Sequence, residues 1–144
     1  MKNIHRAMAL ASLVLLLGVS SVFGQSDRQT VVNIPFNFTV GDKALVAGKY
    51  VIQQNRRDSD TVWVIKSKEN GDAAVLLTRP VRLNKTSDQT KLVFRRYDDF
   101  YFLSEFFTVG NQTGREIQVS NREKALSKAL SLNRQEYILI DRGR

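Results

Sequence analysis

Residues 91–107 read KLVFRRYDDFYFLSEFF, and this stretch indicates the fold class of the chain. Aromatic and β-branched residues, which favour strands, fill both halves of it, and the pair Asp98–Asp99 divides the halves. Two such runs around a short polar pair predict a β-hairpin. Placing Tyr97 opposite Phe100 gives three further cross-strand pairs, which are Phe94 with Leu103, Leu92 with Glu105, and Arg95 with Phe102. The pair of Arg95 and Phe102 allows a cation–π contact.

The residues before this hairpin predict more strands. From Val32 to Val40, apolar residues alternate with other residues, which is the period of a half-buried strand, and Pro35 places that strand at a sheet edge. Asn70–Gly71 predicts a two-residue turn between two further strands. Both faces of this earlier hairpin carry apolar residues, so we expect it at the centre of the sheet. The strands are expected at 49–54, 61–66 and 73–79, with Ile65 opposite Leu76 and Trp63 opposite Thr78.

The pattern changes near the C-terminus. Ser120 and Glu123 have the spacing of a capping box, which opens a helix. Apolar residues at helical spacing continue that helix over about 121–132, and they are Ala125, Leu126, Ala129 and Leu130. Residues 137–140 fit a final strand or a helix tail, and we favour the strand. The sequence therefore predicts one all-β domain at 31–144, a single antiparallel sandwich or flattened open barrel of six to eight strands with one C-terminal helix.

The first 24 residues have the features of a secretory signal peptide. Lys2 and Arg6 precede an apolar run at 7–19, and Gly24 suits cleavage before Gln25. The alternative is an uncleaved anchor, but this run is short of the about 20 apolar residues that span a bilayer. We expect a secreted or periplasmic protein cleaved after Gly24, with a disordered tail at 25–30. Cleavage removes two basic residues and no acid, which changes the net charge from +8 to +6.

The predicted mature chain lacks the side chains of most catalytic and metal sites. The single histidine, His5, lies in the signal peptide, and the chain contains no cysteine. These absences exclude a Ser-His couple, a thiolate nucleophile and a His/Cys metal site. We therefore expect no catalytic residue, no metal and no cofactor.

Acidic residues offer the remaining route to chemistry. Asp98–Asp99 are adjacent and Asp58 lies two residues from Asp60. Paired carboxylates can hydrolyse a glycoside or bind calcium, but acids in turns commonly bond their own backbone. A carboxylate-dependent hydrolase is thus a distant third hypothesis.

Rings and basic residues offer a route to binding. Trp63, Tyr97 and Phe100 are the rings most expected to be free for stacking on sugars, although most aromatic residues of the hairpin should form its core. Arg95 and Arg96 form a basic pair within it. Other basic residues occur at Arg56–Arg57 and around Arg79, Arg82 and Lys85, and scattered pairs of this kind usually form a solvated surface. We expect no nucleic-acid binding.

Two motifs near the N-terminal end of the predicted domain carry a resemblance. Residues 32–41 read VNIPFNFTVG and residues 45–50 read LVAGKY. They resemble a group of uncharacterised small secreted bacterial proteins in which a phenylalanine strand and "VG" lead to "LPAGxY". The likeness continues at 92–97, 101–103, 114–116 and 120–123, and Val46 departs from it where the group has proline. It implies export and a β-rich fold, and it transfers no site.

These observations favour an exported, non-catalytic binding or structural protein of the bacterial envelope or extracellular space. Its expected partner is an envelope polysaccharide or another exported protein, and no transmembrane segment should remain after cleavage. The alternative is a barrel-type carrier of a small apolar ligand.

Overall fold

The computed structural model describes residues 29–55, 60–129 and 133–141. Within them the chain forms ten strands and one helix, α2 (Asn121–Ala129). This confirms the all-β class with a single C-terminal helix. The strands are β1 (Thr30–Ile34), β2 (Phe38–Val40), β3 (Lys43–Leu45), β4 (Gly48–Gln54), β5 (Val62–Ser67), β6 (Ala73–Arg82), β7 (Thr90–Tyr97), β8 (Phe100–Phe107), β9 (Thr113–Ile117) and β10 (Gln135–Asp141).

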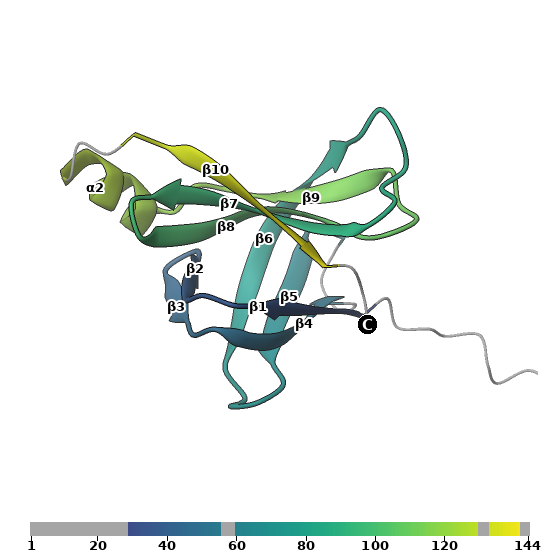
Figure 1. Ribbon diagram of the computed structural model, residues 1–144, viewed down its shortest axis with the longest axis horizontal. Coiled ribbons are helices and arrows are strands. Elements are labelled where there is room, and N and C mark those ends of the chain that lie inside the picture. The colour runs from purple at the N-terminus through teal and green to yellow at the C-terminus, as the bar shows by residue number, and fades with distance from the viewer. Residues whose placement is uncertain (1–28, 56–59, 130–132, 142–144) are drawn as a thin grey trace, which may run out of the picture.

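The strands form one open sheet that folds over into two layers (Figure 1). One layer has the order β1-β4-β5-β6, and the other contains β9, β8, β7 and β10, with β2 and β3 beside β8. Strand β6 belongs to both layers, because Ala73–Leu77 pair with β5 and Thr78–Arg82 pair with β9. The core lies between the layers and includes Ile34, Tyr50, Ile65, Leu76, Leu92, Phe94 and Leu103, all buried.

Two breaks raise the strand number above the expected six to eight. The strand expected at 32–40 divides into β1 and β2 around Pro35, and a second break at Val46–Ala47 separates β3 from β4. The alternation itself is confirmed, since Val32, Ile34, Phe38 and Val40 are buried. Strand β1 lies at a sheet edge as Pro35 indicated. The sheet is not wholly antiparallel, because β2 runs parallel to β8.

The β5–β6 hairpin has a different register from the predicted one. Ile65 pairs with Ala74 and Trp63 pairs with Leu76, two residues away from expectation. The loop is longer than two residues, because Ser67 N donates to Asp72 O at 2.7 Å and closes it. Since the shift is an even number of residues, the side chains keep their faces. The outer face is not covered by the described residues, and Val75 and Leu77 are 62% and 67% exposed.

The β7–β8 hairpin confirms most of its predicted register. Tyr97 pairs with Phe100, Phe94 with Leu103, and Arg95 with Phe102. Leu92 pairs with Phe106 instead of Glu105, because a β-bulge at Val93/Phe94 adds one residue to β8. Ser104 stabilises the bulge by donating its hydroxyl to Val93 O at 2.9 Å.

Helix α2 packs through a carboxylate rather than through an apolar stripe. Glu123 is its only buried residue, whereas Ala125 and Ala129, two of the apolar residues at helical spacing, are exposed. Leu130 lies outside the described residues. One half of the capping box is present, since Glu123 N donates to Ser120 Oγ at 3.1 Å. The carboxylate of Glu123 instead accepts hydrogen bonds from Arg95 and Tyr97. The strand expected at 137–140 is confirmed as part of β10.

Candidate ligand-binding cleft

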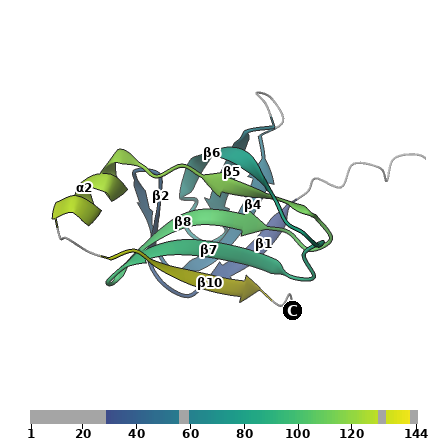
Figure 2. The same ribbon diagram turned by 90° about the horizontal axis from the view of Figure 1, so that it is seen from above.

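An open cleft of about 990 Å³ is lined by residues of both layers, among them Thr90 at the start of β7 and Asp141 at the end of β10. These two strand ends lie at the end of the sandwich away from α2 (Figure 2). Ligand pockets commonly measure roughly 300–1,000 Å³, so this cleft can hold a ligand of substantial size. Both layers contribute to it. Trp63 of β5 comes from one layer, and Phe106 of β8 and Arg115 of β9 come from the other.

Trp63 forms an apolar floor that is held in place. Its indole N–H donates to Asp60 O at 3.2 Å, and its ring meets Phe106 edge-on with centroids 5.0 Å apart. The residue is only 7% exposed. The indole therefore offers a fixed surface at the cleft and adjusts little when a ligand arrives.

Arg115 lies over this floor. Its guanidinium carbon is 5.4 Å from the centroid of the Trp63 ring, within the range of a cation–π contact. The preceding residue must be glycine, because a Cβ at Gly114 would overlap the ring of Phe107 and lie 2.9 Å from Phe106 O. Gly114 thus lets β9 approach β8 closely, and this approach places Arg115 at the cleft.

The rest of the lining is rich in amides and hydroxyls. Asn111 donates its side-chain amide to Thr108 Oγ1 at 2.6 Å, and Thr90 Oγ1 accepts from Val109 N at 3.4 Å. Gln54, Gln89 and Thr113 also line the space, and two acids, Asp88 and Asp141, carry the negative charge. Neutral hydrogen-bonding groups beside an aromatic floor suit a ligand with many hydroxyls.

At the opposite end, three side chains form a buried polar cluster. Arg95 Nε donates to Glu123 Oε1 at 2.6 Å and its Nη2 donates to Glu123 Oε2 at 3.1 Å. The Tyr97 hydroxyl donates to Glu123 Oε1 at 3.1 Å, and the guanidinium also reaches Ile117 O at 3.4 Å. Burial raises the pKa of the Tyr97 hydroxyl, and the charge of Glu123 adds to this effect. We call this group the Arg95–Glu123–Tyr97 cluster.

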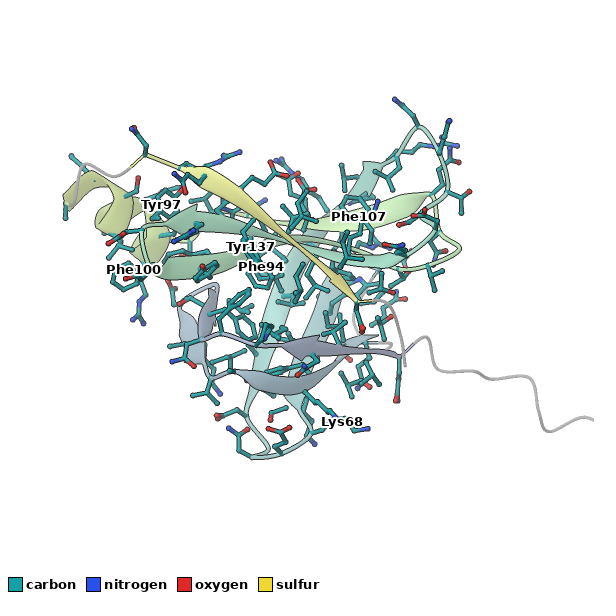
Figure 3. All side chains as sticks on the ribbon, in the orientation of Figure 1. Lys68, Phe94, Tyr97, Phe100, Phe107 and Tyr137 are labelled. Atoms are coloured by element: carbon teal, nitrogen blue, oxygen red, sulfur yellow. The ribbon has the colours of Figure 1, made fainter. Side chains whose placement is uncertain are left out.

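The structure does not bring the five predicted binding residues together. Of these, only Trp63 lines the cleft. The predictions that Arg95 is a surface cation and that Tyr97 is a free ring are wrong. Helix α2 covers both side chains, and only 6% of Arg95 and 5% of Tyr97 are exposed. Phe100 is exposed at the hairpin turn beside Tyr97, at the other end of β8 from Phe107 (Figure 3), and it does not line the cleft. Arg96 lies over the ring of Tyr101 at 5.4 Å.

The predicted acidic pairs do not converge. Asp99 is exposed and 4.0 Å from Arg96, Asp60 accepts from Gln54, and Asp58 lies outside the described residues. The described residues contain no group of three or more acids or histidines that could hold a metal ion.

A pair of acids that the sequence did not single out lies on the outer face of the second layer. Glu105 of β8 pairs in register with Glu116 of β9. Burial raises the pKa of the Glu105 carboxyl, and the charges of Glu116 and Glu136 raise it further. Hydrogen bonds from Arg79 at 2.9 and 3.1 Å lower the pKa of Glu116. Divergent pKa values are typical of acid–base pairs, but Arg79 occupies Glu116 and neither acid lines the cleft.

No family model, curated protein or solved structure matches this chain. Within the described ranges, no helix has both the length and the apolar character needed to cross a membrane. Arg115 and its polar neighbours are the cleft residues that sequence reasoning missed. The polar loop before β9 was their one local signal, and it resembles any other surface loop.

Proposed function

We propose that this protein is an exported, non-catalytic binding protein whose cleft takes a saccharide of the bacterial envelope or extracellular space. One observation carries the proposal: the fixed indole of Trp63 lies beside amide and hydroxyl side chains in a space of about 990 Å³. A sugar presents both an apolar ring face and a rim of hydroxyls, so it can lie against the exposed apolar side chains of Val31 and Val109 while its hydroxyls meet the amide and hydroxyl groups.

The binding role is favoured over catalysis by the residue types available. After removal of residues 1–24 the chain holds no histidine and no cysteine. The acids with divergent pKa values, Glu105 and Glu116, lie on the face of β8 and β9 opposite Phe106 and Arg115. A ligand in the cleft is therefore out of their reach.

A saccharide is also favoured over the small apolar ligand of a barrel-type carrier. The sheet is open, and the space between its layers is filled by packed side chains such as Phe94 and Leu103. The cleft has apolar side chains in Val31, Val109, Trp63 and Phe106, but most of its lining side chains carry groups that can form hydrogen bonds.

Intrinsic fluorescence gives a direct test, because Trp63 is the only tryptophan in the chain. Titration of the mature protein with soluble envelope and extracellular polysaccharides should shift or quench its emission saturably. Affinity electrophoresis in gels containing the same polysaccharides should retard the protein. If no member of the panel changes either the emission or the mobility, saccharide binding is refuted.

The export proposal has its own test. Expression in a bacterial host, followed by mass spectrometry of the envelope fraction and the medium, should find a chain that begins at Gln25. An intact Met1 on protein recovered from the cell interior would overturn it.

A further inference from the structure

We infer that Arg115 makes the cleft selective for saccharides that carry carboxylates, such as uronic acids. The inference rests on the proposed function and names the class of saccharide. It follows from the position of Arg115, which is the single cation among the described residues that line the cleft; the other polar groups of that lining are neutral or acidic.

Arg115 differs from Arg79 and Arg95 in how its charge is satisfied. Arg95 and Arg79 each donate two hydrogen bonds to a glutamate, Glu123 and Glu116 respectively. Arg115 instead contacts the π face of Trp63. Among the described residues, no carboxylate lies within salt-bridge distance of Arg115.

A cation–π contact leaves the N–H donors of a guanidinium available. Arginine presents five such donors in a planar fork that matches a carboxylate in a bidentate pair. The ring of Trp63 limits the positions that this fork can adopt, so a ligand has less side-chain entropy to remove when it binds. The expected ligand group at this point is therefore a planar carboxylate.

The two acids of the cleft limit how much negative charge the ligand can carry. Asp88 is 3.9 Å from Lys91 and its side chain is 82% exposed, while Asp141 ends β10. Carboxylates accept hydrogen bonds from sugar hydroxyls but repel further anions. A chain with one carboxylate at Arg115 and hydroxyls elsewhere satisfies both conditions, whereas a densely sulfated chain does not.

The test compares two forms of one ligand by isothermal titration calorimetry. The probes are a neutral oligosaccharide that carries a single uronic acid residue and the methyl ester of the same oligosaccharide, in which the charge is removed and the sugar backbone is kept. Because hydrogen bonds to charged groups are the stronger ones, the mature protein should bind the acid form at least about tenfold more tightly. Raising the salt concentration should weaken the acid form alone.

Variants locate the effect. Arg115→Gln should lose the preference for the acid and keep its affinity for the ester, and Arg115→Lys should keep only part of the preference. Lys124→Gln, an equal change of charge on exposed α2 far from the cleft, should behave as wild type. Circular dichroism and melting curves confirm that each variant folds.

The outcomes separate this inference from the proposed function. Equal affinity for acid and ester overturns the role of Arg115 and leaves saccharide binding intact. A preference for the acid that survives in Arg115→Gln also overturns it. Binding of neither form overturns the inference as well, and the polysaccharide panel described above then decides the proposed function on its own.

Discussion

Replacing Glu123 by glutamine should destabilise the fold through loss of a buried charge. Glu123 is 1% exposed and receives two hydrogen bonds from Arg95 and one from Tyr97. The amide keeps the shape and can still accept from Tyr97, but it leaves the Arg95 guanidinium buried without a counter-charge. Removing one partner of a buried ion pair costs roughly 3–5 kcal/mol.

Because glutamine has nearly the same shape as glutamate, we expect a loss at the lower end of this range, about 3 kcal/mol in the free energy of unfolding. For a domain of this size, that loss lowers the melting temperature by roughly 12 °C. Urea unfolding followed by circular dichroism and by Trp63 emission measures it. Because α2 has no other buried residue, limited proteolysis should also cut the variant within α2 before the strands.

Two further variants make the reasoning refutable. Lys124→Gln removes a neighbouring exposed charge of α2 and should stay within about 0.5 kcal/mol of wild type. Arg95→Met combined with Glu123→Leu removes both charges, so it should recover most of the loss. A Glu123→Gln protein within about 1 kcal/mol of wild type would refute the role given to the pair. A double variant whose loss of stability equals the summed losses of Arg95→Met and Glu123→Leu, each measured alone, would refute it as well.

Three more outcomes follow from other contacts. Gly114→Ala should cost about 2–4 kcal/mol and weaken saccharide binding, because the new methyl group would overlap Phe107; a variant with wild-type melting and affinity contradicts this. Glu105→Gln should stabilise the protein at pH 7 by about 0.5 kcal/mol after solvent screening, because the raised pKa of Glu105 means that the fold favours its uncharged form. Melting curves should show that this gain disappears as the pH falls below the ordinary glutamate pKa, and a gain that grows in acid refutes the sign. Leu77→Lys on the uncovered face of β6 should leave the unfolding midpoint within about 0.5 kcal/mol, and a larger loss would mean that this face is covered.

The sequence predicted those contacts that arise between neighbours in the chain. The Asp98–Asp99 turn fixed the start of the β7–β8 register, and period-two alternation identified the buried face of β1 and β2. The bulge at Ser104 shifted the far end of the hairpin, and no local pattern announces such an insertion. The Asn70–Gly71 pair predicted a tight turn, but the Ser67 hydroxyl accepts from Glu69 and Asn70 and supports a longer loop.

The candidate site depends on distant residues, and this is why most of it was missed. Trp63 and Arg115 meet only because β6 carries the chain from one layer to the other. Glu123 fitted a helix cap by sequence, yet its carboxylate binds Arg95, 28 positions earlier in the chain. Such pairings follow from topology, which residue spacing alone does not define.

The sharing of β6 between the layers ties the geometry of the cleft to one bend. Thr78 is the first residue of β6 paired with β9, and both its backbone N–H and its hydroxyl donate to Thr61 O. Trp63 moves with the layer before this point and Arg115 with the layer after it. A change in the angle between the two halves of β6 at Thr78 would therefore change the distance between the Trp63 indole and the Arg115 guanidinium, so a single strand controls the width of the cleft.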